Sequence, residues 1–426
     1  MPSPSSQSAP DFRCSRDSQP ALFPPYPDRQ GPRPRAEGDP APIASGPGGS
    51  IPGSPTADCP PPSFPGAAAA PWGSAAFHGA QRRADGRTRN AGAPLVGIAR
   101  LAASSPPAET SRKSQERPEY FLLPVRSILN RCDSDRVPFE WTINPYRGCE
   151  FACKYCYARY THEYMELDGG EFERKIFVKQ NAAPLLAQDV ARKYSYQRAG
   201  ADGPEHIAIG TATDPYQPAE REYGVTRACL DELAKREGLS VSITTKSNQV
   251  VRDIDVLKRI AERSALYLNI TVTTLRSRLA QLLEPRAPRP DLRLRAVQEL
   301  RDAGLMAGVS AAPLLPGITD REGDLEAVAA AAKESGAQWF FTNVLFLMPA
   351  SAKQFMPFLR EKFPRLAKQY EQWYAKNGYA PEEYRRKISA RVAHLRQLHS
   401  FNPRAFDESH LTARRCQLSL TWDNAA

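Results

Sequence analysis

Six short apolar runs alternate with amphipathic stretches of helical period between residues 141 and 347, and this alternation limits the fold more than any other feature. The runs predict strands at 141–144, 206–210, 241–245, 266–272, 305–311 and 340–347. The stretches between them predict helices at 182–197, 223–237, 254–263, 276–283, 292–303 and 324–335. Strand, helix, strand units at this spacing need right-handed crossovers, so we expect an α/β fold with a parallel sheet. Both an incomplete barrel and an open doubly wound sheet satisfy this pattern.

The first 110 residues have a different composition, holding 22 of the 40 prolines and 12 of the 26 glycines. They show neither helical nor strand periodicity, and such a chain cannot bury enough apolar surface to offset its entropy. We therefore predict a disordered tail at 1–115, a core domain at 116–350 and a helical extension at 351–426. A translation start downstream of Met1 is an open alternative for the tail.

The chain has no run of eighteen apolar residues and no apolar segment behind a charged N-terminus. A run of this length would indicate a transmembrane helix, and an apolar segment behind a charged N-terminus would indicate a secretory signal peptide. We therefore expect a cytoplasmic protein.

Three of the eight cysteines form a C-x3-C-x2-C run within NPYRGCEFACKYC, namely Cys149, Cys153 and Cys156. Three thiolates this close can hold three corners of a [4Fe-4S] cube and leave the fourth iron open to a ligand. A structural zinc site needs four closed ligands, and the next cysteine along the chain is Cys229. Zinc and a disulfide stay open as weaker interpretations.

Small, polar or proline-containing clusters follow four of the predicted strands, at 210–214, 244–247, 271–274 and 311–313. The carboxyl ends of parallel strands form the functional face of α/β folds. We therefore expect these clusters to converge. The sequence contains neither a GxxxxGK[ST] loop nor a GxGxxG loop next to a predicted strand.

With this cysteine spacing and Tyr155 before the third cysteine, the chain resembles the radical S-adenosylmethionine (SAM) superfamily over about residues 120–350. The segments NPYRGCEFACKYCYARYTHEY, TATDPYQPAE and TTKS resemble a poorly characterised subgroup similar to the spore photoproduct lyase branch. The resemblance implies a six-stranded partial TIM barrel, one [4Fe-4S] cluster and reductive cleavage of SAM to a 5'-deoxyadenosyl radical. It also implies an electron donor such as flavodoxin or ferredoxin.

The resemblance further implies roles for single residues. Cys149, Cys153 and Cys156 would ligate the cluster, and Tyr155 would lie beside the adenine. The remaining cofactor-binding positions are Gly210, Thr211, Thr213 and Asp214 near the methionine amino group, Lys246 at the methionine carboxylate, Thr271 and Thr273 at the ribose, and Pro313 near the adenine. Without the resemblance, a lysine after a strand is usually solvated and strand threonines usually fill a pleated surface.

This chain departs from the spore photoproduct lyase branch at one position. That branch uses a cysteine near the end of the second strand to return hydrogen to its product. This chain has Thr-Ala-Thr at 211–213 and no cysteine between Cys156 and Cys229. We therefore do not expect thymine-dimer repair. Four polar side chains follow the motif and have two interpretations, contact with substrate or a structural role as a helix cap or ion pair. They stay unassigned: Tyr157, Arg159, His162 and Glu163.

Residues 351–401 predict two amphipathic helices broken near 377–378. Six apolar side chains would pack this extension onto the barrel as a lid: Phe355, Phe358, Leu359, Leu366, Tyr370 and Trp373. Residues 351–400 also hold 11 Lys and Arg against 4 Asp and Glu, and cations interleaved with aromatics suit nucleic acids. The leading hypothesis is a radical SAM enzyme acting on a nucleic-acid-related substrate. Radical modification of a small metabolite or peptide, and a non-catalytic iron-sulfur or zinc-stabilised nucleic-acid-binding module, are the alternatives.

Overall fold

The computed structural model describes residues 97–106, 118–132, 137–197 and 205–401. Its main sheet has seven strands in the order β10-β9-β8-β7-β6-β3-β2. All neighbouring pairs are parallel except β2 with β3. The strands are β2 (Leu129–Arg131), β3 (Trp141–Ile143), β6 (His206–Ile209), β7 (Ser240–Thr245), β8 (Ala265–Thr271), β9 (Ala307–Ser310) and β10 (Phe340–Phe341).

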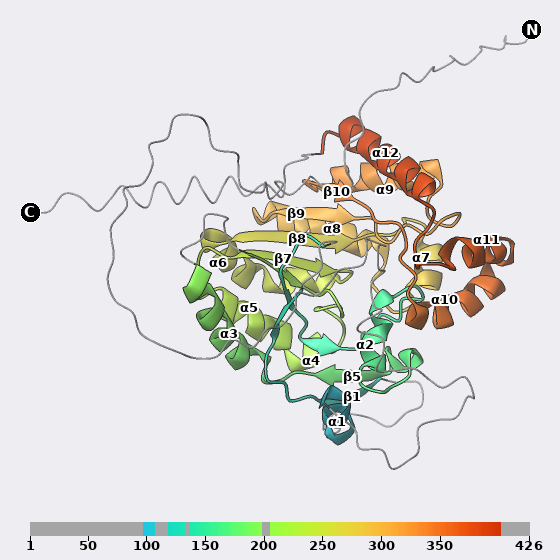
Figure 1. Cartoon of the computed structure of the whole chain (residues 1–426). Coiled ribbons are helices and arrows are strands. Elements are labelled where there is room, and N and C mark those ends of the chain that lie inside the picture. The colour runs from blue at the N-terminus through green and yellow to red at the C-terminus, as the bar shows by residue number, and fades with distance from the viewer. Residues whose placement is uncertain (1–96, 107–117, 133–136, 198–204, 402–426) are drawn as a thin grey trace, which may run out of the picture.

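Helices connect the parallel strands and pack against the sheet (Figure 1). They are α3 (Ala182–Gln197), α4 (Glu220–Tyr223), α5 (Val225–Leu233), α6 (Ile254–Arg263), α7 (Ser277–Leu283), α8 (Pro290–Asp302) and α9 (Glu322–Glu334). The predicted α/β fold with a mostly parallel sheet is confirmed. Closure of the sheet into a partial barrel stays a prediction.

The largest apolar core lies between the sheet and these helices. It includes one branched side chain from each of five neighbouring strands, Ile143, Ile209, Ile243, Ile270 and Val309, each at most 1% exposed. All four residues of β6 and of β9 are buried, as in parallel strands covered on both faces. This packing brings the carboxyl ends of the strands to one edge.

Most predicted elements differ by a few residues from their expected bounds, and two differ more. The helix expected at 223–237 is split, because Gly224 lies in the left-handed region with φ 59° and separates α4 from α5. The strand expected at 340–347 is only two residues long, and Val344 continues the pairing through a single bridge to Leu314.

A second, three-stranded sheet lies beside the first and was not predicted. Its order is β1 (Glu119–Leu122), β5 (Lys175–Val178) and β4 (Tyr146–Arg147), with β5 parallel to β1 and antiparallel to β4. β4 leads directly into the cysteine run, so this sheet carries one end of the candidate site.

The predicted tail is wrong for one segment, because Gly97–Ser104 forms helix α1. Ala102 of this helix packs with Leu123 and Phe177 in a small core, which stabilises the helix. The composition of the surrounding residues hid the helical period of this segment. Residues 1–96 and 107–117 lie outside the described part of the chain.

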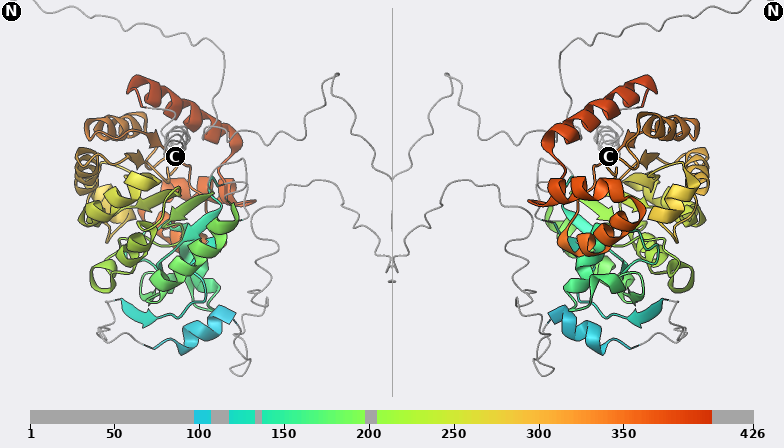
Figure 2. Two further views of the ribbon diagram at one scale, coloured as in Figure 1. Left: turned by 90° about the vertical axis from the view of Figure 1, so that its left-hand side faces the viewer. Right: turned by 90° about the vertical axis from the view of Figure 1, so that its right-hand side faces the viewer.

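Up to residue 401, where the described part ends, the C-terminal extension has three helices, where two were predicted: α10 (Pro349–Lys362), α11 (Pro364–Tyr374) and α12 (Glu382–Leu398). The expected break is present, and Gly378 there has φ 73°. A further break falls at Phe363, because the residue before a proline disfavours the helical conformation. In two further views α10 and α11 lie together, and α12 extends away from them (Figure 2). The first turn of α12 still contacts α11, because the rings of Tyr384 and Trp373 are 5.0 Å apart. None of the described helices is long and apolar enough to cross a membrane.

Candidate active site

The cysteine run forms a loop after β4. Cys149 and Cys153 are each 8% exposed, Cys156 is half-buried, and none of them forms a disulfide. The backbone N–H of Cys149 donates to the Phe172 carbonyl at 3.0 Å, and that of Cys156 donates to the Cys153 carbonyl at 3.2 Å. These bonds hold the three thiols on one short, fixed loop.

Gly148 is required where the loop begins. Its φ is 81°, and a Cβ there would lie 2.7 Å from the Lys175 carbonyl oxygen and 2.8 Å from that of Phe172. Two backbone groups therefore leave no room for a side chain, and the left-handed conformation disfavours one as well.

Other elements hold the same loop from behind. Arg159, 1% exposed, donates through Nη2 to the Cys153 carbonyl at 3.2 Å and pairs with Glu173. Ser351 of α10 donates its hydroxyl to the Cys156 carbonyl at 2.8 Å. The loop is thus fixed by side chains from the C-terminal extension and from its own helical turn.

The thiols fit an iron-sulfur cluster. Burial raises the pKa of Cys149, Cys153 and Cys156, that of Cys153 to about 12, so ligation must release their protons. Among the described residues, no three His, Cys, Asp or Glu side chains converge on a point where one metal ion could bind. A single zinc ion needs such convergence, whereas each thiolate of a cube binds its own iron.

The cluster of residues after β6 meets the cysteine loop, as predicted. Thr213 donates its hydroxyl to the Gly148 carbonyl at 2.6 Å, and Gln217 donates to the same oxygen at 3.2 Å. Gly210, with φ 90°, has no room for a Cβ, which would lie 2.6 Å from the Thr244 carbonyl oxygen. The Thr213 hydroxyl is therefore occupied in holding the loop.

Asp214 is likewise occupied by the protein. Its carboxylate accepts hydrogen bonds from the Thr245 hydroxyl at 2.6 Å, the Lys246 backbone N–H at 2.8 Å and the Tyr216 backbone N–H at 3.0 Å. Burial raises its pKa. Asp214 therefore fixes the end of β7, including the start of the Lys246 side chain.

Lys246 lies next to the cysteine loop. The residue is half-buried, and its ammonium is 5.7 Å from the centre of the Tyr155 ring. In the described part of the chain no carboxylate lies within ion-pair distance of it. Burial lowers its pKa, but the charges of Cys153 and Glu284 more than offset this, and the net shift is upward. The side chain is thus a charged cation without a direct partner.

Tyr155 is 4% exposed and donates its hydroxyl to Glu284, at the end of α7. The Thr273 hydroxyl donates to the same Glu284 oxygen at 2.9 Å. Glu284 pairs with Arg293 of α8 at 2.6 Å, and Arg293 donates to the Thr271 carbonyl at 3.1 Å. Sequence reasoning missed Glu284 and Arg293, because nothing local marks a glutamate at the end of a helix.

The C-terminal extension packs on the cysteine loop, as expected of a lid. A second core joins Cys149, Cys153 and Tyr155 to all six predicted contact residues: Phe355, Phe358, Leu359, Leu366, Tyr370 and Trp373. The extension therefore closes one side of the site.

The residues left unassigned have mostly structural partners. His162 is buried and lies 3.0 Å from the Lys175 carbonyl, and Glu163 pairs with Lys353 of α10 at 3.0 Å. Tyr157 donates its hydroxyl to the Thr211 carbonyl while 44% of its surface stays exposed. Tyr157 therefore bridges the residue after Cys156 to the residues after β6.

Pro313 follows β9 and is half-buried, and Thr271 and Thr273 are buried at the end of β8. All the predicted site residues thus lie at the carboxyl edge of the sheet. Their roles toward a cofactor stay predictions.

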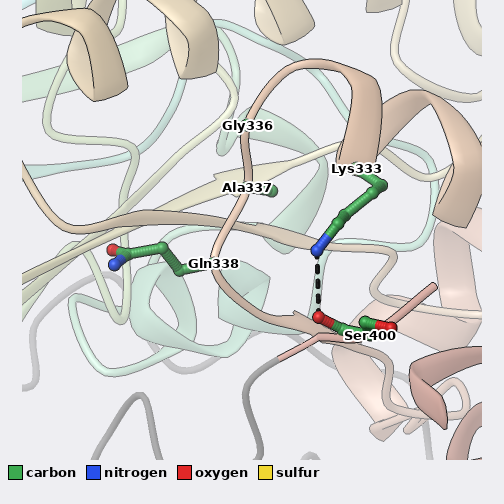
Figure 3. Close-up of a pocket in the computed structure, with 5 residues that line it drawn as sticks. All are labelled: Lys333, Gly336, Ala337, Gln338 and Ser400. Carbon is green, nitrogen blue, oxygen red and sulfur yellow. Dashed lines mark hydrogen bonds between the residues drawn. The ribbon is translucent and has the colours of Figure 1, made fainter.

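A separate cavity of about 230 Å³ lies between the end of α9 and the turn after α12 (Figure 3). Lys333 in its wall donates to the Ser400 carbonyl at 2.9 Å. Gln338, which also lines it, precedes β10, so the cavity is at the amino edge of the sheet. It contains none of the site residues.

Comparisons with known proteins agree with this arrangement. A profile of the Radical SAM superfamily matches residues 143–328. An uncharacterized protein of Mycobacterium tuberculosis is 33% identical over 272 residues, which cover 63% of this chain and 78% of the relative. An uncharacterized protein of Methanocaldococcus jannaschii is 27% identical over 225 residues, which cover 53% of this chain and 77% of the relative.

A solved structure of a spore photoproduct lyase point mutant has a similar fold. Its TM-score is 0.50 at 17% identity, covering 67% of this chain and 80% of the lyase. The profile includes all three cysteines of the run as well as the strand ends that face them. The chain therefore belongs to the radical SAM superfamily.

Proposed function

We propose that the protein is an enzyme that binds one [4Fe-4S] cluster through Cys149, Cys153 and Cys156 and cleaves SAM reductively to begin a radical reaction. The observation that carries this proposal is the fixed loop with three free thiols at the carboxyl edge of a parallel sheet. Membership of the superfamily supports it, because the family uses such a cluster together with SAM.

When bound, the cluster supplies the electron that splits SAM into methionine and a 5'-deoxyadenosyl radical, which takes hydrogen from the substrate. The ammonium of Lys246, which has no ion-pair partner among the described residues, is suited to the methionine carboxylate as a point cation on a flexible stem. Gly210 and Thr211 offer backbone groups for the methionine amino group. Thr213 and Asp214, whose side chains are occupied, act by holding the loop and β7 in place.

The nucleoside half of SAM would lie toward β8 and β9. Thr271 and Thr273 are candidates for its ribose, and Pro313 and Tyr155 for its adenine. The Tyr155 hydroxyl is held by Glu284, so only the ring face and the backbone of this residue are available to a ligand.

Anaerobic reconstitution tests the proposal. The parent protein should bind about four iron atoms per chain and, with SAM and dithionite, form 5'-deoxyadenosine. Replacing Cys149, Cys153 and Cys156 together by Ala should abolish both. The control is Cys229→Ala, since Cys229 is 1% exposed in the main core and should not affect iron binding. Retention of full iron content by the triple variant would overturn the proposal.

The physiological reductant is proposed to be a flavodoxin or ferredoxin. Replacing dithionite by reduced flavodoxin or ferredoxin in the same assay should sustain 5'-deoxyadenosine formation. Failure of both proteins to support it would overturn this partner assignment.

The substrate is proposed to be related to nucleic acid, because the C-terminal extension presents cations that lack a carboxylate. In the described residues, Arg365, Lys368 and Lys376 are exposed and have no ion-pair partner, whereas Arg360 pairs with Glu371. A spore photoproduct lyase of similar fold was solved with a dinucleoside spore photoproduct. Unpaired exposed cations attract phosphates.

Charge reversal separates this substrate class from the others. Changing Arg365, Lys368 and Lys376 to Glu should weaken the binding of a single-stranded oligonucleotide and reduce its salt dependence. The control reverses three exposed cations of α6 and α8: Lys258, Arg263 and Arg295. Equal loss in both variants, or no binding by the parent, would favour a small metabolite or peptide. Binding without 5'-deoxyadenosine formation would favour a non-catalytic module.

A further inference from the structure

A buried ion pair lies directly behind the cysteine loop. The side chains of Glu284 and Arg293 are 0% and 1% exposed, and their charged groups are 2.6 Å apart. Burying two charges costs several kcal/mol per ion, and a buried ion pair is often no more stabilising than apolar residues of similar volume. A pair kept at this position therefore calls for an explanation beyond packing.

The pair joins the cysteine loop to β8. Glu284 accepts from the Tyr155 and Thr273 hydroxyls, and Arg293 donates to the Thr271 carbonyl. Two backbone hydrogen bonds join the same segments. The Lys154 N–H donates to the Leu283 carbonyl at 2.9 Å, and the Arg286 N–H donates to the Phe151 carbonyl at 3.3 Å. The segment containing Glu284 is thus attached to the cysteine loop on both sides of Cys153.

Lys246 adds a third charge on the same side of the loop. Its ammonium lies 5.7 Å from the centre of the Tyr155 ring, whose hydroxyl is bound to Glu284. Tyr155 lies between Cys153 and Cys156 in the sequence, so the Lys246 ammonium and the Glu284 carboxylate both contact the middle of the ligand loop, and Arg293 is paired with Glu284. In this buried setting charges interact more strongly than in water.

We propose that Glu284, Arg293 and Lys246 form a charge triad that sets the reduction potential of the cluster on this loop. Reduction adds a negative charge, which a nearby cation favours and a nearby carboxylate opposes. The triad carries two cations and one anion, so it favours reduction, and Glu284 limits the effect while holding Tyr155. They are positioning residues in this role. This inference rests on the proposed function.

The test measures the midpoint potential of reconstituted full-length protein by an EPR-monitored redox titration without SAM. Glu284→Gln should raise the potential, while Arg293→Met and Lys246→Met should lower it. The double variant Glu284→Gln/Arg293→Met should return toward the parent value. A loss of packing alone would not give shifts of opposite sign that cancel.

Glu220→Gln is the matched control. Glu220 is 0% exposed, accepts from the buried Tyr146 hydroxyl and pairs with Arg252 at 2.9 Å, so it has the same kinds of partner as Glu284, although Arg252 is 39% exposed. Its replacement should leave the potential unchanged. Asp214 and the Arg159–Glu173 pair also lie near the loop and are present in every variant.

Lys246→Met covers the case in which the buried variants do not fold, since Lys246 is half-buried and has no ion-pair partner in the described residues. An unchanged or raised potential in Lys246→Met overturns the inference, as do shifts of the same sign in Glu284→Gln and Lys246→Met. Absence of a cluster from the parent would instead overturn the proposed function. The two failures are therefore distinguishable.

Discussion

Replacing Lys246 by Met should weaken SAM binding without removing the cluster. Lys246 is half-buried, and its ammonium has no direct carboxylate partner among the described residues and lies beside the cysteine loop. A charge-assisted hydrogen bond contributes about 1.5–3 kcal/mol. The dissociation constant of SAM should therefore rise about 10-fold to 150-fold.

Anaerobic equilibrium dialysis of the reconstituted protein with labelled SAM measures this change. Iron content should stay at the parent value, because Lys246 is not a ligand. Lys353→Met is the control, since Lys353 is exposed, lies on α10 and pairs with Glu163 at 3.0 Å. Equal affinity of the Lys246 variant and the parent, at full cluster content, would refute the assignment of this ammonium to the methionine carboxylate.

Three further predictions concern stability. Gly148→Ala should lower the free energy of unfolding by at least about 2 kcal/mol in denaturant titrations, because φ is 81° and a Cβ has no room there. Gly224→Ala is the control: φ is 59° and nothing lies within 4 Å of the added Cβ, so it should cost only the conformational strain of about 1–2 kcal/mol. Deleting residues 1–106 should lower the free energy of unfolding by about 1–3 kcal/mol, because the small core under α1 loses its cover, while deleting residues 1–96 should not. Burial lowers the pKa of His206 to about 4, whereas the unfolded value is about 6.5. Between these two pH values the unfolded chain binds a proton that the folded chain does not, so the free energy of unfolding should be highest above pH 6.5 and should fall as the pH falls toward 4. Replacing His206 by Gln should flatten the dependence of the melting temperature on pH in this range, and an unchanged slope would contradict the assignment.

The parallel α/β pattern and the ligand loop were predictable from the sequence because both depend on short-range patterns. The apolar runs and the helical period between them dictate a parallel sheet, whose carboxyl ends must meet. The three cysteines lie within eight residues, so their chemistry needs no knowledge of the fold. Lys246 was expected at the site because it follows a predicted strand and because the TTKS segment resembles the spore photoproduct lyase branch.

The tertiary structure alone decided what surrounds and tunes this loop. Tyr155 and Glu284 are 129 residues apart in the sequence, and Ser351 reaches Cys156 across 195 residues. Such contacts arise from the packing of separate elements and leave no periodic mark in the sequence. For the same reason Asp214, expected at a ligand, proved to be occupied by the end of β7, and α1 was hidden in a segment of unfavourable composition. Local spacing determines which groups a chain brings to its site, whereas their partners and charges depend on burial, which only the folded chain defines.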